Sequence, residues 1–180
     1  MENASKALIM AGSVLIGVLI LTLFVYLFRT MGEYAAEAER NRAKTQINMF
    51  NTNFTKYLGE TTYEVEDIEK KTCTIHDIVT AANFAKQTNQ ALGYEKEQDY
   101  SDRSDYVQID FYGPGYKKIH LESVIEDEYK KILRNHELNY IPIYDAEGNL
   151  QEYQTRKYIC EITFSAESGR VIYVRFDELK

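Results

Sequence analysis

The stretch that decides the fold of this sequence is ALIMAGSVLIGVLILTLFVYLF, which runs from Ala7 to Phe28 without a charged residue. About 20 apolar residues, at roughly 1.5 Å each, cross the hydrocarbon core of a bilayer. A cleaved secretory signal would have a shorter apolar core followed by a small-x-small cleavage site, and no such site follows this run. We therefore predict a short tail at 1–6 and an uncleaved single-pass transmembrane helix at 7–28.

The helix is expected to continue beyond the membrane through residues 29–58. This stretch has no Pro and one Gly, and its Ala, Glu, Arg, Lys and Gln residues are strong helix formers. Gly59 follows it as a natural C-terminal cap. We predict one nearly continuous helix from about Asn3 to Leu58, on the order of 80 Å long at 1.5 Å per residue. Its last turns carry an apolar stripe at steps of three and four, which should pack against a sheet: Ile47, Phe50, Phe54 and Tyr57.

Residues 59–180 have the patterns of one small soluble α+β domain. Thr74 and Asp77 have the spacing of a capping box that opens a helix, and Gly93 closes that region. Further on, apolar residues alternate as they do in strands. The predicted fold is therefore α+β, with the long helix packed on a C-terminal antiparallel β-sheet meander. The expected later elements are strands at 105–113 and 117–121, a helix at 124–133, and strands at 140–144, 153–164 and 172–176.

Charge and motifs argue against several functions. A net charge of −7 disfavours nucleic acid and anionic lipid surfaces as partners, because both attract concentrated Lys and Arg. The histidines His76, His120 and His136 stand alone, without the short spacings of metal ligands. The turn after Asp145 lacks the Gly and Glu positions of a calcium loop. No nucleophile elbow or phosphate-binding loop is present. We therefore expect that the protein is not an enzyme and that it binds no metal, cofactor or small-molecule substrate.

The two cysteines, Cys73 and Cys160, allow three interpretations. They are far apart in sequence and match no metal-binding spacing. The two residues form a disulfide, or both are inert buried thiols, or one of them is a reactive thiol. A disulfide is favoured where the domain lies outside the cytoplasm.

Small residues gather in the first half of the apolar run. Ala7 and Ala11, and then Ser13 and Gly17, each stand four residues apart, a spacing that allows two helices to approach closely. One interpretation is a helix–helix contact near the N-terminal end. The other is the ordinary abundance of Gly and Ala in membrane helices.

The order of a hydrophobic N-terminal helix, its amphipathic continuation and a β-rich end at Tyr140–Phe176 resembles the type IV pilin and pseudopilin superfamily. The resemblance implies a structural subunit of a bacterial surface filament or secretion-type assembly. Its helices would bundle with copies of the chain or with other pilin-like subunits, and a Cys73–Cys160 bridge would form outside the cytoplasm. The family's processing motif is not found here, so we expect the mature chain to keep its N-terminus. Glu2 is the acid near the start of the helix, where the family uses a Glu for charge pairing.

Flanking charges leave the orientation in the membrane open. Lys6 precedes the apolar run, whereas Arg29 and then Arg40, Arg42 and Lys44 follow it among several glutamates. A simple count of positive charges places the C-terminal domain in the cytoplasm. A short tail with one Lys can equally stay inside while a larger domain is exported, as the resemblance implies. The alternative function is a single-pass, membrane-tethered extracytoplasmic binding or sensing module.

Overall fold

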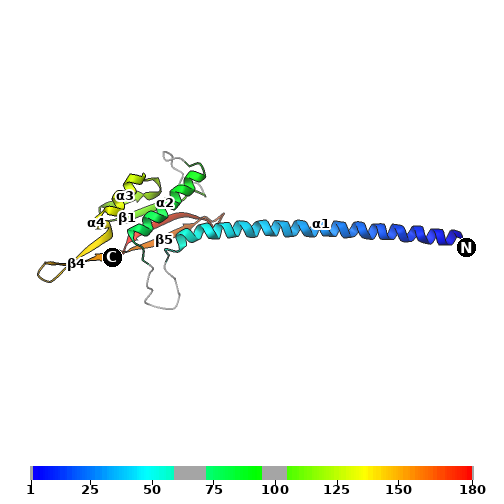
Figure 1. The fold of residues 1–180 in the computed structure, drawn as a ribbon, viewed down its shortest axis with the longest axis horizontal. Helices are drawn as coiled ribbons and strands as arrows, with labels where there is room; N and C mark the ends of the chain where they lie inside the picture. The colour runs from blue at the N-terminus through cyan, green and yellow to red at the C-terminus, as the bar shows by residue number, and fades with distance from the viewer. Residues whose placement is uncertain (1, 59–71, 95–104, 180) are drawn as a thin grey trace. The chain divides into compact units, whose positions relative to one another are not determined.

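The computed structural model describes residues 2–58, 72–94 and 105–179 (Figure 1). The chain divides into an N-terminal part, residues 1–46, and a C-terminal part, residues 47–180, and each is described by itself. The predicted α+β class is confirmed. In chain order the elements are α1 (Glu2–Thr55), α2 (Ile75–Ala91), β1 (Gln108–Gly113), β2 (Tyr116–His120), the 3-10 turn η1 (Leu121–Ser123), α3 (Glu126–Arg134), α4 (His136–Asn139), β3 (Tyr140–Tyr144), β4 (Leu150–Thr155), β5 (Tyr158–Phe164) and β6 (Val171–Glu178).

The N-terminal part is helical throughout its described length, and α1 continues without a break to Thr55. The predicted end at Leu58 is three residues too late, because the chain leaves the helix in a turn. There Tyr57 N donates to Phe54 O and Leu58 N donates to Thr55 O, both at 3.0 Å. The expected cap at Gly59 lies outside the described residues.

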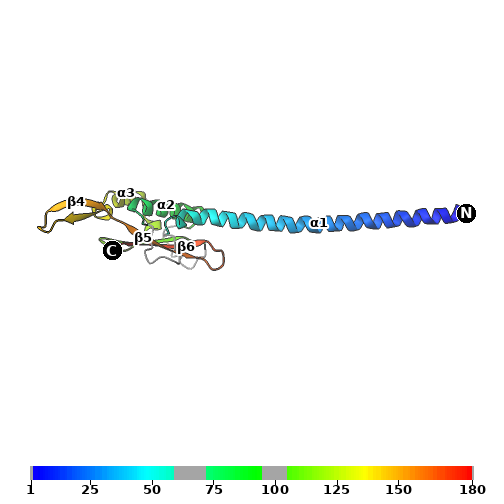
Figure 2. The same ribbon diagram turned by 90° about the horizontal axis from the view of Figure 1, so that it is seen from below.

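The C-terminal part is built on a four-stranded sheet in the order β2-β1-β6-β5. β1 with β2 and β5 with β6 form antiparallel pairs. The two central strands, however, run parallel, with Ile109 opposite Val174 and Phe111 opposite Phe176. A simple meander would pair only consecutive strands. Here the two hairpins are instead joined side by side through strands that are far apart in the sequence (Figures 1 and 2).

The long strand predicted at 153–164 is in fact two strands in different sheets. β4 ends at Thr155 and pairs with β3 in a separate two-stranded ribbon, whereas β5 begins at Tyr158 in the main sheet. Arg156 lies between them and is held on α4 by two bonds. Its backbone N donates to Asn139 O at 2.8 Å, and its Nε donates to Glu137 O at 2.7 Å. These bonds turn the chain, so the alternation seen in the sequence does not continue through one sheet.

The core of this part lies between helices and one face of the main sheet, and Figure 2 shows α2 on one side of β5 and β6. The capping box of α2 forms as predicted, with Thr74 Oγ1 accepting from Asp77 N and Thr74 N donating to Asp77 Oδ2 at 2.9 Å. Gly93 follows the helix end with a φ of 84°, a conformation that glycine adopts without strain. The largest fully buried side chains are Tyr158, Phe54, Phe111, Phe176, Ile75, Ile78, Ile109, Leu121, Ile132 and Leu138.

Two buried asparagines connect helices to the starts of the parallel strands. From α1, Asn51 Nδ2 donates to Gly169 O at 2.8 Å and its Oδ1 accepts from Val171 N at 2.9 Å. From α2, Asn89 bonds both backbone groups of Val107 in the same way, at 2.8 and 2.9 Å. Each amide side chain therefore substitutes for a neighbouring strand at the point where the sheet ladder begins.

Candidate functional site

The first candidate site is the apolar surface of α1 between residues 8 and 28. Its large apolar side chains are 45% to 78% exposed, so no described residue covers them. Among the described helices, α1 is the one long and apolar enough to cross a membrane by length and composition. A continuous apolar surface of this extent is unfavourable in water and calls for lipid or another protein chain.

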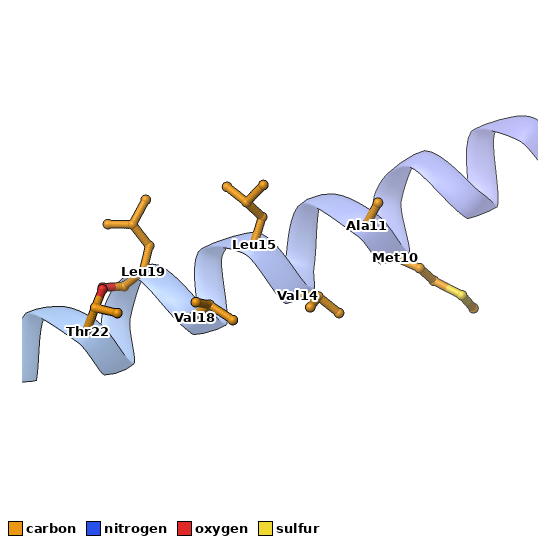
Figure 3. A pocket seen from close by; sticks show the side chains of 7 residues that line it. All are labelled: Met10, Ala11, Val14, Leu15, Val18, Leu19 and Thr22. Carbon is orange, nitrogen blue, oxygen red and sulfur yellow. The ribbon is translucent and has the colours of Figure 1, made fainter.

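This surface carries a shallow groove between two rows of side chains (Figure 3). One row contains Ala11, Leu15 and Leu19, and the other contains Met10, Val14, Val18 and Thr22. Rows of residues four apart form the ridges that pack into the grooves of a second helix. These rows have the spacing at which a second helix packs.

The small residues predicted for a helix contact do not all lie in this groove. Ala11 lines it, whereas Ser13 and Gly17 lie outside its lining. A Cβ placed on Gly17 would meet nothing within 4 Å, so this position is open to a neighbour. Ala7 is exposed one turn before Ala11, and the side chain of Glu2 lies outside what the structure describes.

The two aliphatic hydroxyl groups of the apolar run form hydrogen bonds within the helix. Ser13 Oγ donates to Met10 O at 2.8 Å, and Thr22 Oγ1 donates to Leu19 O at 2.9 Å. A polar group without a partner is costly in hydrocarbon, and these local bonds remove that cost. The side chains of Ser13 and Thr22 are thus chemically compatible with an apolar environment.

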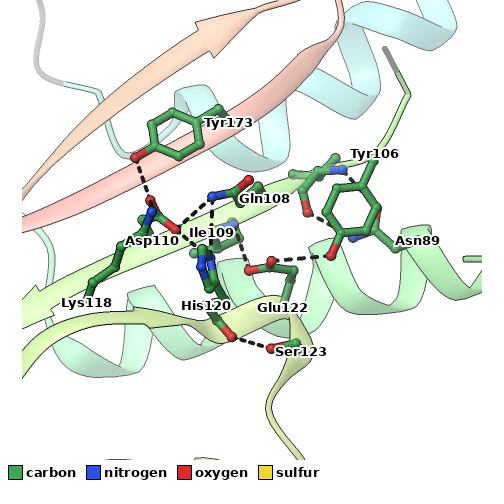
Figure 4. A network of polar contacts seen from close by, with 11 residues as sticks. Asn89, Tyr106, Gln108, Ile109, Asp110, Lys118, His120, Glu122, Ser123 and Tyr173 are labelled. Atoms are coloured by element: carbon green, nitrogen blue, oxygen red, sulfur yellow. Dashed lines mark hydrogen bonds and ion pairs between the residues drawn. The ribbon is translucent and has the colours of Figure 1, made fainter. Parts of the chain in front are cut away.

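The second candidate site is a buried carboxylate in the main sheet, Asp110 on β1, which is 1% exposed (Figure 4). Four side chains converge on it: Gln108 Nε2 at 3.0 Å, Lys118 Nζ at 3.0 Å, His120 Nδ1 at 2.8 Å and Tyr173 Oη at 2.7 Å. Burial alone would raise the pKa of Asp110. The hydrogen bonds from Gln108, Tyr173 and Lys118 and the charge of His120 outweigh it, so the pKa lies below its usual value.

The pKa of a second buried acid, Glu122 in η1, is shifted in the opposite direction. Its carboxylate accepts from Ile109 N at 2.8 Å and from the Tyr106 hydroxyl at 3.3 Å. Burial nevertheless raises its pKa above the usual value, because these bonds do not fully replace the lost water. Figure 4 shows both acids with their separate sets of partners.

The hydrogen bonds and ion pairs of this polar network connect neighbouring elements of the C-terminal part. Asp110 joins three strands, since its partners come from β1, β2 and β6. Glu122 bonds the backbone of β1 directly. Both acids point at donors of the protein itself, whereas a general acid or base must be directed at a substrate. Within the described ranges, no group of three or more His, Cys, Asp and Glu side chains could hold a metal ion.

The apolar stripe at the end of α1 contacts both helix and sheet. Phe54 is fully buried, and its ring lies 5.5 Å from Phe50 and 5.4 Å from Phe84 of α2. Tyr57 contacts Phe176 of β6, with ring centroids 6.2 Å apart. Tyr57 thus has a ring contact with the sheet, Phe50 and Phe54 have ring contacts with α2, and all three belong to or pack against the same core cluster as Val174 and Phe176 of β6. Arg170 covers the Phe50 ring at 3.9 Å, and Ile47 is half-buried.

Cys73 and Cys160 are brought into the same region by strand pairing. Cys73 exchanges backbone hydrogen bonds with Tyr158, two residues before Cys160 on β5. Both are present as thiols, and Cys73 Sγ lies 3.8 Å from Tyr57 O. Burial, with the nearby Cys73 and Glu161, raises the pKa of Cys160 to about 12, so it is a poor nucleophile at neutral pH. The disulfide stays a prediction.

Sequence reasoning missed Asp110, Glu122, Asn51 and Asn89. One signal was available for Asp110, which is a charged residue inside the alternating stretch QIDFYG. No local sequence pattern identifies the asparagines, whose partners are backbone groups at or just before the starts of β1 and β6. Comparison of the chain with protein-family models, with curated proteins and with solved structures finds no match.

Proposed function

We propose that this protein is a membrane-anchored structural subunit of pilin-like architecture, which assembles through its N-terminal helix into a bacterial surface filament or secretion-type assembly. The observation that carries the proposal is that one uninterrupted helix serves two environments. Its residues 8–28 expose every large apolar side chain, and its residues 47–55 belong to the packed C-terminal part, with Phe54 fully buried.

A flexible tether would be enough to hold a soluble domain at a membrane. Here the helix continues without Pro or a described break from Glu2 to Thr55. The groove lined by Ala11, Leu15 and Val18 offers that helix a surface for another helix. Both features suit a subunit whose helix packs among neighbouring helices. The proposal places the N-terminus in the cytoplasm and the C-terminal part outside it.

A second candidate function is a membrane-tethered extracytoplasmic binding or sensing module. The β3–β4 ribbon supports it, because Tyr140, Tyr144 and Tyr153 are 41%, 59% and 51% exposed. Exposed aromatic rings are enriched at contact surfaces. A module of this kind would act through the ribbon and would require no helix bundling.

Chemical cross-linking in native membranes separates the two functions. An assembly subunit should give a ladder of oligomers from the full-length protein, and the ladder should persist when expression is lowered. A tethered module acting alone should give one band at every expression level. A single band in the wild-type protein would rule out the assembly function.

Protease treatment of intact cells tests the orientation. A protease added outside the cells should cleave the C-terminal part. The turn at residues 145–149, which connects β3 to β4, is an accessible site for cleavage. Cleavage only after the membrane has been opened would place this part in the cytoplasm.

A further inference from the structure

The segment of α1 that follows the apolar run carries its charges in two blocks. Glu33, Glu37 and Glu39 come first, and Arg40, Arg42 and Lys44 follow, all of them exposed. Arg29 forms an ion pair with Glu33, with Nε and Oε1 3.3 Å apart. Among the described residues, no ion-pair partner is found for the other five charges of the two blocks. An acidic block beside a basic block within one helix therefore remains available to another molecule.

Most of these charges lie on one face of the helix. Arg29, Glu33, Glu37, Arg40 and Lys44 follow one another at steps of four, four, three and four, which places them in a single stripe. Arg29 stands seven residues, or about two turns, after Thr22, the last residue of the groove. The charged stripe is thus the continuation of the apolar groove of Figure 3. Glu39 and Arg42 lie elsewhere on the circumference.

We propose that this stripe binds a second copy of the same chain, displaced along the helix axis by about seven residues, so that Glu33 and Glu37 of one copy face Arg40 and Lys44 of the other. The inference rests on the proposed function, since it requires self-assembly. Two copies anchored in one membrane by the same helix run parallel. A displacement of seven residues corresponds to roughly 10 Å along the helix.

Displacements of zero and four residues bring like charges together, whereas displacements of three and eight residues give only one opposite-charge pair each. With no displacement, Glu33 faces Glu33 and Arg40 faces Arg40. A displacement of four residues sets Glu33 against Glu37 and Arg40 against Lys44. Seven residues give two opposite-charge pairs and no like-charge pair. The same displacement sets Ala11 opposite Val18, so the apolar groove still meets apolar side chains.

The charges would set the register, and the apolar groove would supply most of the attraction. Exposed ion pairs contribute little to affinity because water and salt screen them. Like charges placed against each other do disfavour the wrong register, which is how charged positions select partners in helical assemblies. The order of charges along the helix therefore selects the register of the second copy, and the charged side chains need not be buried to do so.

Cysteine cross-linking of the full-length chain in native membranes measures the displacement. Ala36 and Ala43 are exposed, stand seven residues apart and lie close to the stripe. Two tagged variants, A36C and A43C, should form a disulfide-linked dimer when they are co-expressed and oxidised. Either variant alone should give only the background of the wild-type chain, which controls for Cys73 and Cys160. A parallel pair without displacement would instead cross-link each variant with itself.

A charge exchange provides an independent test. E33K/E37K and R40E/K44E should each lose the A36C–A43C cross-link, and co-expression of the two should restore it, because every interface then joins opposite charges. The matched control E39K/R42E changes charges off the stripe and should keep the cross-link.

Each outcome bears on a different claim. Self-cross-linking of A36C, or a cross-link that survives E33K/E37K, overturns the displacement while a wild-type ladder leaves the assembly function standing. Absence of any oligomer in the wild-type chain overturns both.

Discussion

The apolar side chains of the two parts of this protein have opposite environments. In the N-terminal part, every large apolar side chain from Leu8 to Phe28 is at least 45% exposed. In the C-terminal part, side chains of the same types form one buried cluster around Phe54, Phe111 and Phe176. The C-terminal part therefore has a core that can stabilise it in water, whereas the apolar run of the N-terminal part gains stability only from lipid or neighbouring chains.

Polar groups differ in the same way. In the N-terminal part, Ser13 and Thr22 bond carbonyls of their own helix. In the C-terminal part, Asn51, Asn89 and Glu122 bond the backbone of other elements. A substitution in the first group changes a local contact, and one in the second group changes how elements are joined. The predictions below use this contrast and run from the largest expected effect on the C-terminal part to the smallest.

Phe54→Ala should lower the free energy of unfolding of the C-terminal part by roughly 3–5 kcal/mol, because it removes a fully buried ring from two aromatic neighbours, Phe50 and Phe84. Urea unfolding of the detergent-solubilised full-length chain, followed by the near-ultraviolet circular dichroism of its tyrosines, measures it. Phe24→Ala is the matched control at an exposed position of the same helix. Equal losses for both variants would contradict the contrast between the two parts.

A Cys73–Cys160 bridge should add at most about 4 kcal/mol to the C-terminal part by restricting its unfolded chain. Protein taken from intact cells, denatured without reductant and treated with a thiol reagent should show no labelling. Denaturation is necessary because burial in the folded protein raises the pKa of Cys160 and would itself slow the reaction. Two labelled cysteines would exclude the bridge.

Asn51→Ala should cost about 1–3 kcal/mol, since it leaves Val171 N–H and Gly169 C=O without their partner. Asn89→Ala should cost a similar amount at Val107. The control is Asn48→Ala, an exposed position on the same helix, which should change stability by less than about 0.5 kcal/mol. If Asn51→Ala matched Asn48→Ala, the connection between helix and strand would have no energetic weight.

The two buried acids should give opposite dependences of stability on pH. The pKa of Asp110 is lowered from 3.8, so its contribution is present above that value and is lost as the pH falls through the folded pKa. The pKa of Glu122 is raised from 4.5, so its contribution is present below that value and is lost as the pH rises through the folded pKa.

Unfolding of the wild-type chain at a series of pH values checks both signs. Asp110→Asn should flatten the loss of stability on the acid side, and Glu122→Gln should flatten the decline above pH 4.5. A variant that shifts the whole curve without changing its slope would show that the acid does not titrate as its environment predicts.

Gly17→Leu should leave the stability of the C-terminal part unchanged, because Gly17 lies in the N-terminal part and a Cβ added there meets nothing within 4 Å. Its effect should appear only as a weaker ladder of cross-linked oligomers, since the added side chain blocks close helix approach. A ladder of wild-type strength in Gly17→Leu would remove the Ser13–Gly17 pair from the interface.

Local patterns predicted much of the fold. The capping box at Thr74 and the turn at Gly93 depend on neighbouring residues and appear as expected. The strand predicted at 153–164 was divided because Arg156 bonds α4, a contact that alternation cannot reveal. The candidate site around Asp110 was not predicted, because its donors come from several strands and the sequence does not show which strands are neighbours in the sheet.

By itself, the sequence determined the apolar run at 7–28, the continuation of its helix and the α+β class, because hydropathy and periodicity act over a few helical turns or one strand. Only the tertiary structure decided the parallel pairing of β1 with β6, the burial of Asp110 and the bonds of Asn51 and Asn89 to strand backbones. These features join residues that are remote in the chain. Which of them meet depends on how all elements pack together, and a one-residue change of register would direct Asp110 to the opposite face.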